Sequence, residues 1–188
     1  MELEEKTLES RLVFDGRLLK LYRDEVSLPS GGRSVREYVH HPGGAAVVAL
    51  DGDGNVWLER QFRYPYRKAV TEIPAGKLEE GEDPFDAIRR ELKEELGAEA
   101  LRWDSLGRIM PSVGYTDETL YLYLARDLTF GETHWDAGEF LEPFKLPFAE
   151  ALEQAADGRI SDGKTVSALF RADRLIRGET NGQGDING

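Results

Sequence analysis

The stretch "GKLEEGEDPFDAIRRELKEELGA", from Gly76 to Ala98, constrains the fold of this chain more than any other segment. Four of its apolar residues recur at helical spacing and form a stripe suited to burial: Phe85, Ile88, Leu92 and Leu96. Proline is favoured in the first turn of a helix and glycine just after the last, which are the places of Pro84 and Gly97. The sequence therefore predicts an amphipathic helix over about residues 84–96.

One edge of this predicted helix is acidic. Glu91, Glu94 and Glu95 stand at i, i+3 and i+4, so they share a face. Like charges at this spacing repel by roughly a few tenths of a kcal/mol per pair, so the cluster needs either solvent or a cation. Carboxylate oxygens on a rigid face suit Mg²⁺ or Mn²⁺. An ion pair between Arg90 and Glu82 could orient these ligands, whereas a solvated acidic helix is the alternative.

Composition narrows the class of protein. The length of 188 residues favours one domain with a small appendage. The net charge of −12 argues against binding of nucleic acid or of anionic membranes, because both require a positive surface. The absence of cysteine excludes disulfides, thiolate metal sites and a cysteine nucleophile. Since no segment is typical of a signal peptide or a transmembrane helix, the expected location is the cytoplasm.

Strand-like segments separated by turns dominate the chain outside the acidic helix. Residues 1–42 contain three expected strands, and "HPGG" then breaks the pattern. Residues 43–178 form the expected main domain, of mixed α/β class. Its expected strands lie at 45–63 (a hairpin), 69–76, 101–110, 118–126 and 139–145, and its two closing helices at 147–156 and 163–176. The polar, glycine-rich tail at 179–188 is expected to be disordered.

The spacing of the fixed residues in the acidic stretch resembles the complete signature of the Nudix hydrolases, G-x5-E-x7-R-E-U-x-E-E-x-G-U. The flanking segments "EIPAGKLEEGE", "QFRYP" and "REYVHHPGGAAVVAL" are similar to the ADP-ribose pyrophosphatase branch of that family. The resemblance extends from about Glu5 to Leu175. It implies a Nudix α/β/α sandwich that carries an N-terminal β-rich segment exchanged across a homodimer.

The resemblance also implies roles for the residues of the signature. Mg²⁺, with Mn²⁺ as an alternative, is expected on three carboxylates and one backbone carbonyl: those of Glu91, Glu94, Glu95 and Ala75. Arg90 and Glu94 are expected to take part in catalysis. The remaining fixed residues are expected to have structural roles: Gly76, Glu82 and Gly97.

The substrate implied by the resemblance is a nucleoside diphosphate sugar, with ADP-ribose first, which an activated water cleaves to AMP and ribose 5-phosphate. Four residues are expected to contact it, the first two of them from the partner subunit: Arg36, Glu37, Arg63 and Glu118. Metal ligands make poor general bases, because a bound cation depresses the proton affinity of a carboxylate. The resemblance therefore assigns the base to Glu139, at the end of an acidic loop, with Glu142 second and Glu118 third.

One departure from the branch leaves the substrate open. The Ser-Pro-Gly that the branch carries after the signature is Ser112-Val113-Gly114 here. Another nucleotide sugar or a dinucleotide is therefore an alternative substrate, and a nucleotide-sensing module without turnover is an alternative of a different class. The intact glutamates argue against the sensing module. The number of metals stays open, as does whether Tyr64 or Tyr66 stacks on the base.

Overall fold

The computed structural model describes residues 2–133 and 140–182. Its backbone contacts divide the chain into two compact units. The N-terminal unit comprises Met1–Gly43 and Met110–Thr119, and the main unit comprises Gly44–Ile109 and Leu120–Gly188. The loop at 110–119 groups with the N-terminal unit, although it lies within the sequence range 43–178 expected for the main domain.

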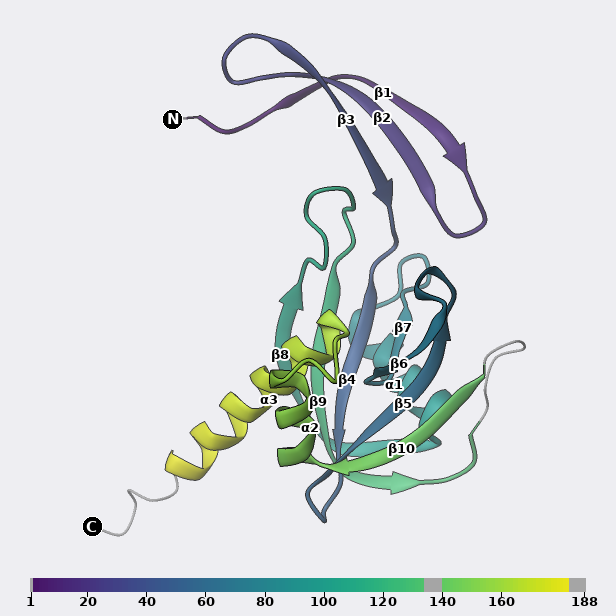
Figure 1. Ribbon diagram of the computed structural model, residues 1–188, viewed down its shortest axis with the longest axis vertical. Helices are drawn as coiled ribbons and strands as arrows, with labels where there is room; N and C mark the ends of the chain where they lie inside the picture. Colours follow the sequence, from purple (N-terminus) through teal and green to yellow (C-terminus); the bar gives the residue numbers. More distant parts are fainter. Residues whose placement is uncertain (1, 134–139, 183–188) are drawn as a thin grey trace. The chain divides into compact units, whose positions relative to one another are not determined.

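The N-terminal unit is built on the three strands that the sequence predicts. They are β1 (Lys6–Asp15), β2 (Lys20–Ser27) and β3 (Arg33–His40), paired antiparallel in that order (Figure 1). Gly31, with φ of +85°, closes the turn between β2 and β3 in a backbone region that favours glycine.

The loop at 110–119 attaches to β3 by its backbone. Val39 N–H donates to the Tyr115 carbonyl at 2.8 Å, and Asp117 N–H donates to the Val39 carbonyl at 3.3 Å. The loop therefore extends the edge of the three-stranded sheet next to β3.

Apolar side chains of the N-terminal unit are largely left exposed. Eleven large ones are exposed in the described part of this unit: Leu3, Leu8, Leu12, Val13, Phe14, Leu18, Leu19, Val35, Met110, Val113 and Tyr115. Val26 is the only buried hydrophobic residue in β1–β3. A segment of this size cannot bury a core by itself, so these side chains form a surface available for association.

The main unit contains a mixed sheet. Five strands lie in the order β10-β5-β4-β9-β8, with β6 paired to β5 and β7 paired to β4. Only β4 and β9 pair in parallel among the described strands of this sheet. The strand bounds are β4 Gly44–Leu50, β5 Asn55–Arg63, β6 Lys68–Glu72, β7 Ala75–Lys77, β8 Ala98–Ile109, β9 Leu120–Phe130 and β10 Leu141–Pro147.

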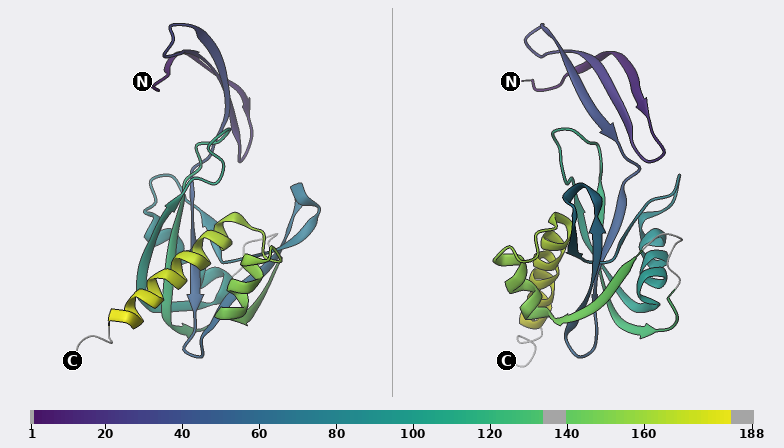
Figure 2. Two further views of the ribbon diagram at one scale, coloured as in Figure 1. Left: turned by 60° about the vertical axis from the view of Figure 1, so that its left-hand side comes forward. Right: turned by 45° about the vertical axis from the view of Figure 1, so that its right-hand side comes forward.

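Helices cover both faces of this sheet. Helix α1 (Pro84–Leu96) lies on one face, and α2 (Phe148–Ala156) and α3 (Gly163–Gly182) lie on the other (Figure 2). Side chains of β4 alternate between the two cores: Ala46 and Val48 pack towards α2 and α3, and their neighbours pack towards α1. The predicted α/β/α sandwich is therefore confirmed for the main unit. None of the described helices has the length and apolar character needed to span a bilayer.

Helix α1 has the ends that its sequence predicts. Asp83 is the N-cap residue, and its carboxylate accepts a hydrogen bond from Phe85 N–H at 2.8 Å. Gly97 ends the helix with φ of +61°. A side chain at Gly97 would also meet the Gly131 carbonyl, since a Cβ placed there would lie 2.6 Å from that oxygen. Both its conformation and its surroundings therefore require glycine.

The prediction of a disordered tail from residue 179 is wrong for its first residues. Helix α3 continues to Gly182, six residues beyond the predicted end. Leu175 and Ile176 pack against the core, and Glu179 accepts hydrogen bonds from Arg102 on β8 and Arg126 on β9. These ion pairs lie 77 and 53 residues apart in sequence, so local composition gave no sign of them. Residues 183–188 lie outside the described part of the chain.

Candidate active site

A single guanidinium group organises the acidic face of α1. Arg90 donates to Glu82 through Nε at 3.1 Å and Nη2 at 3.2 Å, so the predicted ion pair between loop and helix is present. Its Nη1 is shared by Glu91 at 2.8 Å and Glu94 at 3.1 Å. Arg90 thus neutralises carboxylates that would otherwise repel one another.

These contacts shift the ionisation of both partners. The hydrogen bonds to Glu82 raise the pKa of Arg90 above its already high ordinary value. The hydrogen bond from Arg90, with help from the Glu79 N–H, lowers the pKa of Glu82 below its ordinary value of 4.5. Both groups are therefore charged at neutral pH, and the loop that carries Glu82 stays fastened to the helix.

The first glycine of the signature makes room for one carboxylate. A Cβ placed on Gly76 would lie 1.8 Å from Glu91 Oε1, a distance that no side chain can occupy. Residue 76 must therefore be glycine for the Glu91 carboxylate to lie against β7. The reason is close approach rather than backbone conformation.

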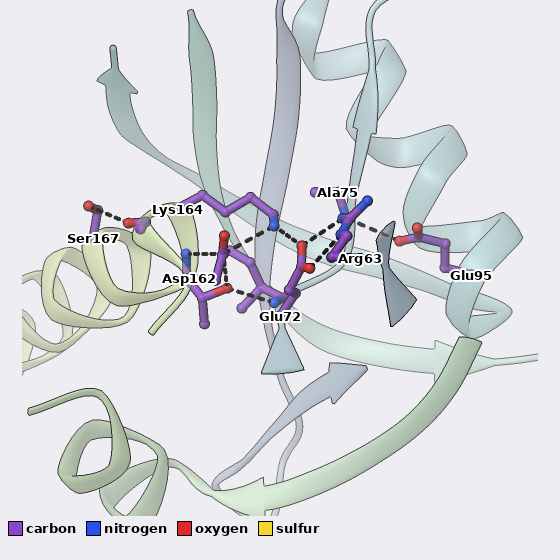
Figure 3. Close-up of polar contacts among 10 residues, drawn as sticks. Arg63, Glu72, Ala75, Glu95, Asp162, Lys164 and Ser167 are labelled. Carbon is purple, nitrogen blue, oxygen red and sulfur yellow. Dashed lines mark hydrogen bonds and ion pairs between the residues drawn. The ribbon is translucent and has the colours of Figure 1, made fainter. Parts of the chain in front are cut away.

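Glu95 lies at the buried end of the acidic face. It is 4% exposed, and its Oε2 accepts a hydrogen bond from Ala75 N–H at 3.1 Å (Figure 3). This bond fixes the backbone of Ala75 beside the helix. The structure therefore brings together the two residues, Ala75 and Glu95, that the sequence places 20 positions apart in one predicted metal site.

The donor set of this face fits a hard divalent cation. Glu91, Glu94 and Glu95 offer carboxylate oxygens, with the side chains of Glu91 and Glu94 15% and 35% exposed. Among the described residues, no three histidine, aspartate or glutamate side chains are placed so that they could hold a metal ion by themselves. Mg²⁺ bound together with substrate phosphates needs only one or two protein carboxylates. The face therefore supplies enough carboxylates for such a cation. Phosphate oxygens of a substrate would complete its coordination.

A second charged cluster lies at the junction of β5, β6 and α3. Arg63 donates to both oxygens of Glu72, through Nε at 2.6 Å and Nη2 at 2.7 Å. Lys164 also donates to Glu72 and reaches Asp162 at 3.0 Å (Figure 3). Burial alone would raise the pKa of Glu72, but the hydrogen bonds and charges of Arg63 and Lys164 outweigh it and lower that pKa below its ordinary value of 4.5.

Two of the three predicted substrate residues in the N-terminal unit, Arg36 and Glu37, share one hollow, which Glu118 does not line. Arg36, Glu37 and Tyr38 on β3 and residues 113–117 of the loop line a cavity of about 270 Å³. The Arg36 guanidinium is already paired with Glu5, at 2.9 Å from its Nε. Contact between Arg36 and a substrate therefore requires an exchange of partner.

Asp117 joins the same loop to the end of β3 through two histidines. His40 Nδ1 lies 2.6 Å from Asp117 Oδ2, and the His41 N–H donates to Asp117 Oδ1 at 2.9 Å. His41 Nδ1 accepts from the Gly43 N–H at 3.1 Å and lies 3.5 Å from Glu118 Oε1. Burial would raise the pKa of Asp117, but its hydrogen bonds with His40 and the His41 N–H lower it. The sequence contains no sign of these contacts, because His40 and Asp117 lie 77 residues apart and leave no local pattern.

The residues predicted as the general base or as stacking rings lie in different parts of the chain. Glu139 lies outside the described residues. Glu142 lies on β10 and pairs with Arg60 at 3.5 Å. Tyr64 and Tyr66 are exposed in a short 3₁₀ turn, where the Arg67 guanidinium lies 3.5 Å from the centre of the Tyr64 ring. Neither tyrosine belongs to the core, so both rings are accessible.

Nothing in the sequence indicates the charged cluster around Arg63. Glu72, Asp162 and Lys164 were given no role, although Asp162 has the position of a helix N-cap in "SDGKT". That pattern predicts the start of a helix, but it does not show that Lys164 pairs with Glu72, which lies 92 positions away in the sequence.

Comparisons with known proteins agree with this geometry. The sequence model of the NUDIX domain matches residues 40–169, and that of the nucleoside diphosphate sugar hydrolase N-terminal domain matches residues 5–39. The methanol dehydrogenase activator of Bacillus methanolicus is 42% identical over 168 residues, which cover 88% of this chain and 91% of that protein. An ADP-ribose pyrophosphatase of Bacillus subtilis is 38% identical over 169 residues, which cover 89% of this chain and 91% of that protein.

One solved structure shows the same fold. The crystal structure of an ADP compounds hydrolase superposes with a TM-score of 0.83 at 24% identity, and the alignment covers 95% of this chain and 98% of that one.

The lowered pKa of Glu72 predicts a pH-dependent loss of stability. Because the folded-state pKa lies below the ordinary one, ionised Glu72 stabilises the fold above about pH 4.5, and this contribution is lost as the pH falls through the folded-state value. Glu72→Gln should therefore lower the free energy of unfolding at about pH 7, and the difference from wild type should shrink at about pH 3.5. Urea unfolding at both pH values measures it.

The exposed Glu142 provides the control for this measurement. Its side chain is 70% exposed, so Glu142→Gln should change the free energy of unfolding little at either pH. A Glu72→Gln deficit that stays constant from neutral to acid pH would contradict the assignment.

Proposed function

Because the chain belongs to the Nudix family, with the N-terminal domain of the nucleoside diphosphate sugar hydrolases, we propose that it hydrolyses ADP-ribose to AMP and ribose 5-phosphate in a reaction that depends on Mg²⁺ or Mn²⁺. Its general activity is that of a Nudix pyrophosphatase of nucleoside diphosphate sugars. The observation that carries the proposal is the acidic face of α1 beside Ala75, with Glu95 fixed to that backbone at 3.1 Å.

The proposed metal ligands are Glu91, Glu94, Glu95 and the carbonyl of Ala75. A bound divalent cation would neutralise the diphosphate, polarise a phosphorus atom and lower the pKa of a bound water. The chain's own residues prepare this site before any ligand arrives. Arg90 holds the Glu91 and Glu94 side chains, and the Ala75 N–H holds Glu95, so little conformational entropy remains to be lost when they bind.

Arg63 is the proposed diphosphate contact of the main unit. Its Nε and Nη2 are committed to Glu72, and Nη1 makes no hydrogen bond within the described residues. The side chain is 40% exposed. A guanidinium anchored at one edge by a carboxylate presents its remaining N–H groups in a fixed direction, which suits a phosphate oxygen.

In the proposed reaction, the oxygen of a water attacks one phosphorus of the diphosphate. The bond from that phosphorus to the bridging oxygen breaks, the second phosphate leaves with that oxygen, and a base takes the proton of the water. We assign the base to Glu139, because a carboxylate outside the metal site keeps its proton affinity. Glu142 and Glu118 are the second and third candidates.

ADP-ribose as the substrate is supported by relatives rather than by a base-specific contact. The Bacillus subtilis protein of that name is 38% identical over most of both chains. Val113, in place of the proline that the branch carries, lies in the hollow that Arg36 and Glu37 line. Another nucleotide sugar or a dinucleotide is therefore the second candidate, and a substrate panel decides between them.

Loss of one ligand carboxylate tests the metal site. Wild-type protein with Mg²⁺ should release phosphate, after coupling to a phosphatase, fastest from ADP-ribose among a panel of nucleoside diphosphate sugars and dinucleotides. Glu95→Gln should lose at least about 99% of turnover and weaken Mn²⁺ binding. Glutamine keeps the shape of the side chain but removes the negative charge that binds the cation.

The control is Glu99→Gln, which alters an exposed glutamate paired with Lys93 at 2.7 Å. It should keep wild-type turnover. Wild-type turnover of Glu95→Gln at saturating ADP-ribose would refute the metal site, and a preference for another substrate would refute ADP-ribose alone.

Replacement of the proposed base separates proton transfer from metal binding. Glu139→Gln should lower kcat by about a hundredfold, the range usual for a general base, while Mn²⁺ affinity measured by paramagnetic resonance stays at the wild-type value. Glu142→Gln should keep most of kcat. If instead Glu142→Gln loses activity and Glu139→Gln retains it, the base is Glu142.

We also propose that the chain is a homodimer in which the N-terminal β-rich segment contributes Arg36 and Glu37 to the partner's substrate. The exposed apolar side chains of β1–β3 support this proposal, because a second copy would bury them. Light scattering should give about 42 kDa, twice the 21.1 kDa of one chain. Phe14→Glu should shift the protein towards monomer, whereas Leu101→Glu, at an exposed leucine of the main unit, should not.

Mixed subunits test the shared site directly. Arg36→Ala and Glu95→Gln chains should each be nearly inactive, and their mixture should regain activity, because one site of each mixed dimer then has both residues. A fully active wild-type monomer, or a mixture that stays inactive, would rule out the exchange.

A further inference from the structure

The first turn of α3 is tied to the strand that leads into the acidic face. Asp162 caps this helix, since its Oδ2 accepts from the Thr165 N–H at 2.9 Å. The Thr165 hydroxyl lies 2.6 Å from the same oxygen and accepts the Ile73 N–H at 2.9 Å. Because the hydroxyl has one proton, it donates to Asp162 while it accepts from Ile73.

Lys164 extends this tie to Glu72. Its side chain is 10% exposed and runs from α3 to the Glu72 carboxylate, with Asp162 on one side and Arg63 beyond (Figure 3). Glu72 itself is 2% exposed and receives both cations. One of them, Arg63, has an exposed edge, and the other is enclosed.

The segment from Glu72 to Ala75 is therefore held from both faces of the sheet. Arg63 and Lys164 bind Glu72, Thr165 binds the Ile73 backbone, and Glu95 on α1 binds the Ala75 backbone. Helix α3 lies on the opposite face from α1. The position of the proposed metal carbonyl and that of the proposed phosphate arginine thus depend on one short segment.

The lysine offsets part of the negative charge around Arg63. Three carboxylates, those of Glu59, Glu72 and Asp162, act on the Arg63 guanidinium, and Lys164 is the second cation of the cluster. Without Lys164, three carboxylates would remain around one guanidinium, in a largely buried place where charges are weakly screened. The cluster would then be more negative by one unit and would attract a diphosphate less, and Glu72 would have only one cation to hold it in position.

We propose that Lys164 is a positioning residue for the diphosphate: it shares Glu72 with Arg63 and so keeps the exposed edge of Arg63 both oriented and electrically available to the substrate. This role rests on the proposed function, in which Arg63 contacts the diphosphate. Lys164 is enclosed and does not touch the substrate itself.

The test compares Lys164→Met with Lys145→Met. Methionine has similar length and tolerates burial, so Lys164→Met removes the charge with little change in volume. The matched control is Lys145, a lysine on β10 whose Nζ lies 3.5 Å from Asp51 Oδ2. Lys164→Met should raise KM for ADP-ribose about tenfold and change kcat less than about threefold, whereas Lys145→Met should change neither.

A double-mutant cycle separates positioning from general stability. In an Arg63→Ala background, Lys164→Met should alter KM by less than about twofold, because the group on which it acts is gone. An equal rise in KM in both backgrounds would overturn the proposal. So would a Lys164→Met protein with wild-type KM and a lowered melting temperature, since the lysine would then only tie α3 to the sheet.

Asp162→Asn keeps the test valid if Lys164→Met does not fold. Asparagine caps helices as well as aspartate does, so α3 should be retained while the cluster gains one unit of positive charge. The proposal predicts that KM falls by about twofold or stays unchanged, and a rise in KM would contradict it.

Binding of ADP distinguishes failure of this inference from failure of the proposed function. Titration calorimetry of ADP measures affinity for a diphosphate without turnover. If the wild-type protein hydrolyses no diphosphate of the panel but binds ADP about tenfold more tightly than Lys164→Met does, the function is wrong and the positioning role stands. If it hydrolyses ADP-ribose and both proteins bind ADP equally, the positioning role is wrong.

Discussion

The hydrogen bonds of Arg90 are the interaction on which the candidate site depends. Three glutamates on one helical face repel one another, and this guanidinium offsets the repulsion by binding Glu82, Glu91 and Glu94 together. The same contacts join the loop before α1 to the helix itself. A helix that carries this much negative charge can therefore keep one face in the core, because its own arginine stabilises the carboxylates that the proposed function assigns to a cation.

Close packing explains the spacing of the glycines around this face. Gly76 is required by the Glu91 carboxylate, and Gly97 by both its φ of +61° and the Gly131 carbonyl. Each glycine lets a neighbouring group approach the backbone at a distance that no Cβ allows. The two glycines at the ends of the acidic stretch are thus required for the same reason: helix α1 lies very close to strand β7 and to the chain at Gly131.

Most of the secondary structure could be predicted from local sequence patterns, because helix caps, strand alternation and helical spacing depend on residues close together in the chain. The ends of α1, the three N-terminal strands and the ion pair between Arg90 and Glu82 follow from caps, alternation and helical spacing. What the sequence did not reveal depends on residues far apart: Lys164 with Glu72, and the loop at 110–119 with β3. The extension of α3 to Gly182 belongs here too, because distant arginines hold Glu179. Pairing of this kind is set by tertiary packing, which overrides the tendency of a glycine-rich tail to disorder.

Under the proposed function, the division into two units separates two chemical tasks. The carboxylates of α1, Ala75 and the Arg63 cluster all belong to the main unit, where strands and helices fix them from both faces of one sheet. Val113 and the residues of β3 that line the hollow belong to the other unit. Val113 lies on the loop at 110–119, which His40 holds through Asp117. Groups that bind a diphosphate need fixed geometry, whereas groups that choose among nucleosides need freedom to vary. If the proposed function holds, changes at Val113 should alter the preferred nucleotide and leave the reaction type intact, because the acidic helix belongs to the other unit.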